Sequence, residues 1–576
     1  MKICFFSQRR FAYISHAIAI VLKKKYGVAE FCAYAQLRSS YEFLRNQTDI
    51  KYTSLILDED IHNGFKNEPL DLEYLKNLEQ KYGFPNLWHC LTVDRVLMHS
   101  QMIREYPYNN PKYSHEEMLR IVQVQAKTII KFLDEEKPSA VIFTVVGCVG
   151  SMLLYQIAKK KGILTLVISE TRINDECTLT EDYKNLSWAE ETFNQLKITG
   201  AASPSAKKAQ IYLAKFRHNP LACLAYWAEA DVKKPKNRWS NYRWFLPKNF
   251  FDSWRWFIKT IVRYFAAKKH QDYAEGTPWH YFLDRLKRKL RTLIGFEHLY
   301  DKADFREDYA FFPLHLEPEI TTMLFAPFWT DQINLIKQIA RSLPVHFKLY
   351  VKEHPSMLGY RPHSYYKELK KIPNVKLIDP DITSFQIIAN AKLITVITGT
   401  TGWEAVLLKK PVITFGDVFY NCLPAVKRCV QIEQLPYLVQ EQLKNFQDDD
   451  ATLINFIGSI MEVSLPANLS KVWSSGINKS RDQQALTMLA DLIARKLNLK
   501  PINKSSIKGP FLISYISASS LTSTLWPPDR KIIASPARKY KFLNIFFPSS
   551  YKVTLILPFD TIRHSCNCFV ILCFGS

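Results

Sequence analysis

Hydroxyl groups and glycines follow a predicted strand in the middle of the chain. The apolar, β-branched run at 393–397 predicts a buried strand. The loop that follows consists of Thr398, Gly399, Thr400, Thr401 and Gly402. Glycines allow close approach of backbone to a ligand, and the N–H groups at the start of the helix expected over 403–408 attract anions. The stretch suits a phosphate loop, but a Thr-rich loop that only caps a helix has the same pattern.

A second predicted strand, 347–352, ends at Glu353-His354-Pro355. Pro355 stops the strand and fixes the turn. A single histidine is usually structural, but His354 follows its strand as the Thr/Gly loop follows its own. From there it can donate to a phosphate oxygen. Glu404 lies in the first turn of the expected helix, where its carboxylate can reach a ligand hydroxyl.

These residues need a sheet to bring them together. Short apolar runs alternate with helical patterns from 350 to 420, and each run stops at Gly, Pro, Thr or Asp. This alternation predicts βαβ units in a parallel sheet. In such sheets ligands bind beyond the carboxyl ends of the strands, which is where the polar residues fall.

The N-terminal part predicts a second α/β domain. A strand over 1–7 leads to Arg9 and Arg10, which can meet an acidic acceptor or simply face solvent. The Gly-rich dinucleotide fingerprint is absent here, which argues against an NAD or FAD enzyme, and we expect no cofactor. A further βαβ unit ends at residue 169 and is followed by carboxylates that can act as a base toward an acceptor hydroxyl. The candidates are Glu170, Asp175, Glu181 and Asp182.

The totals describe a basic chain. A chain of 576 residues is too long for a single hydrophobic core. Its formal net charge of +23 indicates an anionic partner. Most cysteines lie inside apolar runs, as buried thiols do in a reducing compartment. We expect no signal peptide and no transmembrane helix, and therefore a cytoplasmic protein that can rest on the inner face of the membrane.

A basic, aromatic segment separates the two predicted domains. Between residues 233 and 291 sixteen Lys or Arg stand against four acidic residues, with tryptophans and phenylalanines interleaved. This composition favours an interfacial segment on anionic lipid. A packed insert between domains is the second interpretation. Single-stranded nucleic acid is the third, and without a nucleic-acid module signature we expect no nucleic-acid partner.

The strings EHP, TGTTGWEA and KKPVITFGDVFY together resemble the capsule polysaccharide biosynthesis family over residues 311–429. These are GT-B glycosyltransferases related to bacterial Kdo transferases and, more loosely, to polysialyltransferases. The resemblance implies that His354 and the Thr398–Gly402 loop hold the donor phosphate and that Glu404 binds nucleotide or sugar hydroxyls. It also places His315, Glu353 and the turn at Asp381 on the donor side.

The combined prediction is an α/β, GT-B-like fold with two Rossmann-type domains facing a cleft and a basic aromatic helical insert. The expected ranges are 1–201 for the acceptor domain, 202–300 for the insert, 301–498 for the donor domain and 499–576 for a disordered tail. The predicted activity is metal-independent transfer of a sugar from a nucleotide donor, CMP-Kdo by the resemblance, to a polysaccharide or lipid-linked acceptor. The alternatives are a nucleotide-sugar epimerase, a CDP-polyol phosphotransferase, and a non-catalytic assembly protein.

Overall fold

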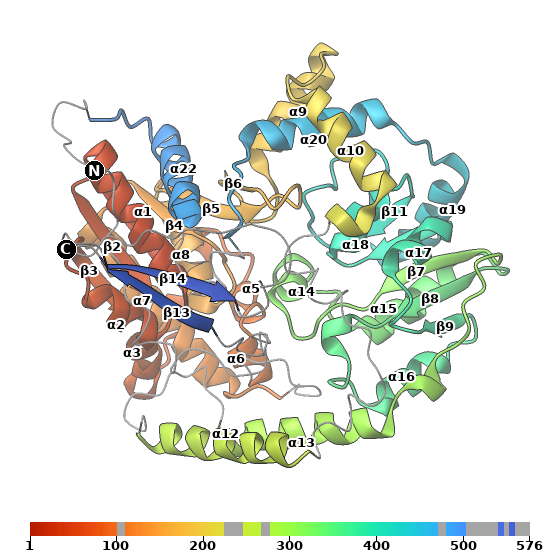
Figure 1. Ribbon diagram of the computed structural model, residues 1–576, viewed down its shortest axis with the longest axis horizontal. Coiled ribbons are helices and arrows are strands. Elements are labelled where there is room, and N and C mark those ends of the chain that lie inside the picture. Colours follow the sequence, from red (N-terminus) through yellow and green to blue (C-terminus); the bar gives the residue numbers. More distant parts are fainter. Residues whose placement is uncertain are drawn as a thin grey trace. The chain divides into compact units, whose positions relative to one another are not determined.

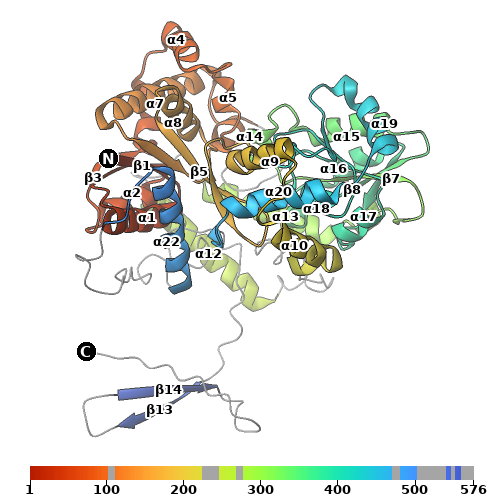
Figure 2. The same cartoon turned by 90° about the horizontal axis from the view of Figure 1, so that it is seen from above.

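The computed structural model describes residues 1–100, 110–223, 246–266, 277–469, 480–502, 540–546 and 552–558 (Figures 1 and 2). Residues Met1–Ile513 form one compact unit and Ser514–Ser576 another. The tryptophans at 239 and 244 in the basic segment lie outside the described residues.

The first sheet has the order β3-β2-β1-β4-β5-β6. Its strands are β1 (Lys2–Ser7), β2 (Glu30–Ala35), β3 (Tyr52–Leu57), β4 (Ala140–Phe143), β5 (Leu164–Glu170) and β6 (Cys177–Thr180). All neighbouring pairs are parallel except β5 and β6. Strands such as β4 are buried along their whole length, as expected for a parallel sheet with both faces covered.

The helices of this part include α7 (His115–Glu136), which begins at a capping box formed by Ser114 and Glu117. The others are α1 (Phe11–Tyr26), α2 (Arg38–Arg45), α3 (Asp58–Asn63), α4 (Leu72–Tyr82), α5 (Trp88–Leu91), α6 (Arg95–His99) and α8 (Val149–Lys160).

The second sheet has the order β12-β11-β10-β7-β8-β9 and all its pairs are parallel. Its strands are β7 (Tyr309–Pro313), β8 (Lys348–Lys352), β9 (Val375–Ile378), β10 (Leu393–Val396), β11 (Val412–Thr414) and β12 (Val426–Arg428). The accompanying helices are α14 (Ile320–Phe325), α15 (Gln332–Ser342), α16 (His363–Lys370), α17 (Ser384–Asn390), α18 (Thr400–Leu407), α19 (Leu435–Asn445) and α20 (Asp450–Val463). The predicted fold class, with two Rossmann-like α/β sheets, is confirmed.

The chain crosses between the two sheets earlier than the predicted boundary at residue 201. Helices α9 (Ser187–Thr199) and α10 (Ala206–His218) share a core with the second sheet. The rings of Phe193 and Phe456 lie 5.0 Å apart, and Arg217 pairs with Asp450 at 2.7 Å. The apolar faces of both helices are buried in this core, so α9 and α10 belong with the second sheet.

The chain also returns to the first sheet. We expected the last helix, α22 (Ser480–Lys496), to complete the second domain, but it packs against α1 (Figures 1 and 2). The carboxylate of Asp491 accepts from Lys25 Nζ at 2.7 Å and from Tyr26 OH at 2.8 Å. The buried side chains of Leu489 and Ile493 explain the placement, because α22 has an apolar face that must be covered.

The basic segment forms two long helices, α12 (Pro247–Ala266) and α13 (Pro278–Ile294), as predicted. In the tail, where we expected disorder, β13 (Tyr540–Phe546) and β14 (Lys552–Pro558) form an antiparallel hairpin. Both strands are rich in aromatic and β-branched residues, which favours pairing.

Candidate functional site

The carboxyl ends of the second sheet bring the predicted donor residues to one edge. His315 follows β7, Glu353 and His354 follow β8, Asp381 follows β9, and the Thr398–Gly402 loop follows β10. The strand order reverses between β7 and β10, which lie side by side. Such a switch point is where open α/β sheets bind ligands. His315 and the Thr/Gly loop are therefore neighbours across it.

His315 contacts the Thr/Gly loop directly. The backbone N–H of Thr398 donates to His315 Nε2 at 3.3 Å, and a Cβ on Gly399 would lie 3.0 Å from the same nitrogen. Burial and the neighbouring positive charges of His354 and Arg361 lower the pKa of His315 to about 3. His315 is therefore neutral at physiological pH. It shapes the loop rather than supplying positive charge to a phosphate.

The loop itself begins its helix earlier than expected. We predicted a helix from Trp403, but α18 starts at Thr400 and Gly399 occupies the cap position. The N–H groups of the first helical turn therefore belong to the threonines of the loop, at the edge where His315 lies. Tyr420 OH donates to Gly399 O at 2.9 Å and holds this start in place.

Gly402 is required by close packing behind the loop. A Cβ at this position would lie 2.3 Å from Tyr420 Oη and 2.8 Å from Val396 Cγ2. The glycine therefore lets α18 sit directly against β10 and Tyr420, which fixes the position of the threonines in front of it.

His354 is oriented by its own backbone turn. Its Nδ1 accepts from the N–H of Ser356 at 3.1 Å, so Nε2 carries the proton in the neutral ring. The side chain is half-buried. A proton on Nε2 is the arrangement that a donor to a phosphate oxygen needs.

Glu353 belongs to a buried ionic network. Its Oε1 accepts from Arg361 Nη1 at 2.5 Å and from the N–H of His354 at 2.6 Å, and its Oε2 accepts from Tyr366 OH at 2.7 Å. Arg361, itself fully buried, also pairs with Glu317 at 3.1 Å and donates to His315 O at 2.6 Å. Glu353 thus positions both histidine-bearing loops, a role that suits it better than the donor contact we expected.

The buried Lys352 and the partly buried Glu404 influence each other through their opposite charges, which the sequence analysis did not foresee. Burial lowers the pKa of Lys352 to about 8, and the Glu404, Asp381 and Asp379 carboxylates oppose that shift. Burial raises the pKa of Glu404 to about 7, opposed by the charge of Lys352. Lys352 Nζ donates to Ser384 Oγ at 3.1 Å. The available signal was a lysine at the last position of the strand, directly after the buried residues Leu349, Tyr350 and Val351.

Asp381 is exposed beyond β9, the strand at the border of the sheet. Its N–H donates to Asp379 Oδ1 at 2.8 Å, which forms the predicted turn. The negative charge of its carboxylate favours the protonated form of Lys352 and so raises the pKa of that lysine.

In the first sheet, Arg9 and Arg10 follow β1 where the strand order reverses between β1 and β4. Both are half-buried, and Arg9 adopts a left-handed backbone with φ 47°. Burial lowers the pKa of the Arg9 guanidinium from its ordinary value. Both arginines therefore lie at the carboxyl end of the first sheet, and their contact with an acceptor stays a prediction.

The four candidate carboxylates separate into two pairs. Glu170 ends β5 and pairs with Arg172 at 2.8 Å, and Asp175 lies in the following turn with φ 57°. Glu181 and Asp182 come after β6, which is antiparallel to β5 and places Thr180 opposite Val167. They therefore lie toward the amino ends of the parallel strands. The direction of β6 excludes Glu181 and Asp182 from the edge where we expected them.

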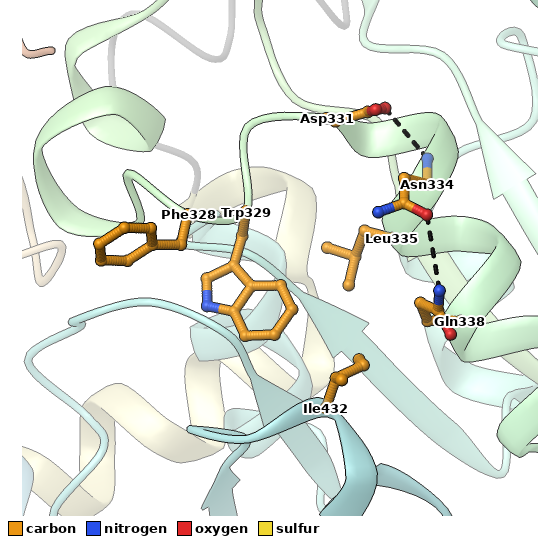
Figure 3. A pocket seen from close by; sticks show the side chains of 7 residues that line it. All are labelled: Phe328, Trp329, Asp331, Asn334, Leu335, Gln338 and Ile432. Atoms are coloured by element: carbon orange, nitrogen blue, oxygen red, sulfur yellow. Dashed lines mark hydrogen bonds between the residues drawn. The ribbon is translucent and has the colours of Figure 1, made fainter.

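A small pocket lies away from these residues. It has a volume of about 170 Å³ (Figure 3). Its wall consists of Phe328, Trp329, Asp331, Asn334, Leu335, Gln338 and Ile432. None of the predicted donor residues lines it, so it is distinct from the candidate site. Among the described residues no group of three or more His, Cys, Asp or Glu could hold a metal ion.

The sequence match covers the part of the chain that forms this edge of the second sheet. Residues 300–424 match the family model of capsule polysaccharide biosynthesis proteins. This segment is similar to that family. It contains β7 to β11 and every residue of the candidate donor site described above. The resemblance noted from the motifs is confirmed for this segment.

One curated relative is Protein FixF of Sinorhizobium fredii, 30% identical over 163 residues. The match spans 27% of this chain and 38% of FixF, so the chain covers well under half of that relative.

Solved structures with a similar fold include KpsC, a β-Kdo 2,7 transferase of Thermosulfurimonas dismutans. It is 12% identical with a TM-score of 0.32 and covers 66% of this chain and 98% of its own. A UDP-GlcNAc 2-epimerase of Methanocaldococcus jannaschii is 14% identical with a TM-score of 0.24 and covers 80% and 99%. At these scores neither likeness carries an argument about activity.

Proposed function

We propose that the chain is a glycosyltransferase that takes a sugar from a nucleotide-activated donor for the synthesis of a surface polysaccharide. The observation that carries this proposal is the contact between His315 Nε2 and the N–H of Thr398 at the switch point, beside the oriented His354. The family match of the segment supports the class of pathway.

The donor phosphate would lie against the start of α18. Backbone N–H groups of Thr400 and Thr401 and the Nε2 proton of His354 would stabilise the charge that develops on the leaving phosphate. Glu404 would accept from a sugar or ribose hydroxyl, and Lys352 behind it would favour its ionised form. This arrangement supplies charge stabilisation from the protein itself, and we propose that transfer is metal-independent.

The acceptor would approach from the first sheet. An acceptor hydroxyl attacks the anomeric carbon, its proton passes to a carboxylate, and the bond to the nucleotide phosphate breaks with the electron pair leaving on the phosphate. We propose Glu170 or Asp175 as that carboxylate, because Glu170 ends β5 and Asp175 lies in the turn that follows it, at the carboxyl edge of the first sheet. Arg9 and Arg10 at the same edge would bind an acidic glycan or glycolipid acceptor.

Several features support a cytoplasmic site of action. The described cysteines, eight in number, are all free, and six of them are buried. Buried thiols without cross-links are typical of a reducing compartment. No helix in the described part of the chain is long and apolar enough to cross a membrane.

The direct test is incubation of the full chain with CMP-Kdo or another nucleotide sugar, with and without a glycolipid acceptor, followed by product analysis. The proposal expects nucleotide release that depends on acceptor and persists in EDTA. Conversion of the free nucleotide sugar to an epimer would establish the epimerase alternative. Transfer of a polyol phosphate would establish the phosphotransferase. Nucleotide binding without any turnover would favour an assembly protein.

A further inference from the structure

Helices α12 and α13 carry exposed apolar stripes. On α12 these side chains recur every three or four residues, and the same spacing holds on α13, so each set forms one helical face. The stripe residues are Phe251, Trp254, Ile258, Val262 and Phe265 on α12, and Trp279, Leu283, Leu286, Leu290 and Ile294 on α13. Exposed fractions of 70% for Phe251 and 69% for Ile294 show how little of this surface the described residues cover.

The two helices pack together mainly through other side chains. Phe257 is buried, and its ring lies 5.0 Å from that of Phe282. The guanidinium of Arg285 stacks over Trp256 at 3.3 Å. The stripe residue Trp279 borders this contact, since its ring lies 5.7 Å from that of Phe257, but its side chain stays 65% exposed. The packed-insert interpretation therefore accounts for Phe257 and Phe282 but not for the stripes.

Positive charge accompanies the stripes. Together the two helices contain nine Lys or Arg and two Asp. The basic residues are Lys248, Arg255, Lys259 and Arg263 on α12, and Arg285, Lys287, Arg288, Lys289 and Arg291 on α13. One of the two acidic residues, Asp284, is paired with Arg288 at 2.8 Å. An apolar face bordered by lysine and arginine is the composition of helices that lie in a membrane interface.

The end of α13 is tied to the loop that follows His354. Arg288 Nη1 donates to Tyr360 OH at 3.1 Å, and its guanidinium lies 4.5 Å from the Tyr360 ring. Arg291 Nη1 donates to Tyr360 O. Tyr360 precedes Arg361, whose guanidinium holds Glu353 and Glu317. The stripe-bearing helix is thus joined to the wall of the candidate donor site.

We propose that the stripes of α12 and α13 dock on an anionic phospholipid bilayer. The apolar side chains would enter the acyl boundary and the flanking lysines and arginines would contact lipid phosphates. A second copy of the chain is a poorer occupant, since two surfaces of the same strong positive charge repel each other. Nucleic acid is also poorer, since it offers bases to aromatic rings but nothing to the aliphatic residues Ile258, Leu286 and Leu290. This inference does not depend on the identity of the donor.

The experiment is sedimentation of the full chain with vesicles of phosphatidylglycerol and phosphatidylcholine, and with vesicles of phosphatidylcholine alone. We expect binding to the anionic vesicles, weakened by salt. The double variant Ile258→Asp/Leu290→Asp should lower the partition coefficient by at least about tenfold, because it removes two inserted apolar side chains. The matched control is Ile198→Asp/Ile211→Asp, which alters two isoleucines on α9 and α10 that are more exposed than Ile258 and Leu290, and this variant should bind within about twofold of the parent.

A second measurement avoids dependence on the folding of the Asp variant. Brominated phospholipids quench tryptophans that enter the bilayer, so they should quench part of the parent emission, and Trp254→Phe/Trp279→Phe should remove that part. Equal binding by parent and stripe variant, or no quenching, would overturn the proposal. Self-association that the stripe variant abolishes, without vesicle binding, would identify a second copy as the occupant. Binding to an oligonucleotide but not to vesicles would identify nucleic acid as the occupant of the stripes.

Discussion

His354 is the residue whose role is easiest to isolate. Its ring is oriented by the N–H of Ser356 and is only half-buried, so its removal should leave the fold intact. We expect His354→Ala to weaken nucleotide binding by roughly ten- to a hundredfold in calorimetric titration, the worth of a hydrogen bond to a charged group. His346→Ala is the control, because His346 is an exposed histidine paired only loosely with Asp308 at 3.7 Å. Equal affinity in the parent and His354→Ala would remove His354 from the site.

Glu404 should make stability depend on pH. Burial raises its pKa from 4.5 to about 7, so between these values the folded state holds a proton that the unfolded state has lost. The contribution of Glu404 is therefore fully present below pH 4.5 and is lost as the pH rises through 7. The free energy of unfolding should fall across this interval by less than about 1.4 kcal/mol per pH unit, because the residue keeps some exposure.

The variant Glu404→Gln cannot titrate, so its denaturant unfolding should lack this fall between pH 4.5 and 7. The comparison is the difference between parent and variant at each pH, which cancels the other titrating groups. A constant difference across the range would show that Glu404 has an ordinary pKa.

At this scale the sequence predicted the polar residues that follow the strands, because proline, glycine and threonine mark the ends of strands. His315 and the Thr398 loop do meet. The sequence did not predict that the Glu353 carboxylate accepts hydrogen bonds from Arg361 and Tyr366. The contact with Arg361 forms because the chain folds back and brings this residue, eight positions away, next to Glu353. Nor did the sequence identify Lys352 as the partner of Glu404, since the two are brought together only by the adjacent strands and helices.

Among the elements, the start of α18 depends on Gly402. A methyl group there would collide with Tyr420 Oη and Val396 Cγ2. Gly402→Ala should therefore destabilise the chain by about 1–3 kcal/mol in denaturant unfolding and displace the loop, with weaker nucleotide binding. Gly64→Ala is the matched control, because Gly64 has a helical backbone and nothing within 4 Å of its Cβ position. If both substitutions were equally mild, the packing between α18 and Tyr420 would be looser than described.

Elements with strong periodicity or clear ends were predicted well. The way in which they pair with neighbouring elements was predicted less well. The strand before EHP and the strand before the Thr/Gly loop are both present. The antiparallel direction of β6 was not foreseen, because four buried residues after a turn read the same in either direction. That one reversal moved Glu181 and Asp182 away from the ligand edge.

On the scale of the whole molecule, the chain crosses from the first sheet to the second and then returns through α22. Leu489 on α22 is fully buried. Leu489→Ala should cost about 2–5 kcal/mol of unfolding free energy, as expected for a core leucine. Leu72→Ala on α4, where the side chain is 62% exposed, should change it by no more than about 0.5 kcal/mol. A small effect at Leu489 would mean that α22 is not part of the packed core.

Two α/β domains and a basic insert were predictable because hydrophobic alternation and charge runs are properties of the sequence itself. The residues at which the chain crosses between the two sheets were not predictable, because α9, α10 and α22 have apolar faces that would suit either core. The choice depends on complementary surfaces such as Phe193 against Phe456 and Asp491 against Lys25 and Tyr26. Such contacts between residues hundreds of positions apart leave no local pattern.

The central claim, a nucleotide-sugar site at the switch point of the second sheet, is tested most directly by nucleotide binding. The measurement is the melting temperature of the full chain with CMP, CDP, UDP, GDP or ADP, each with and without EDTA. Because a ligand that binds only the folded state raises the melting temperature, we expect a rise with one nucleotide that EDTA does not change and that His354→Ala reduces. No shift with any nucleotide at millimolar concentration would contradict the account.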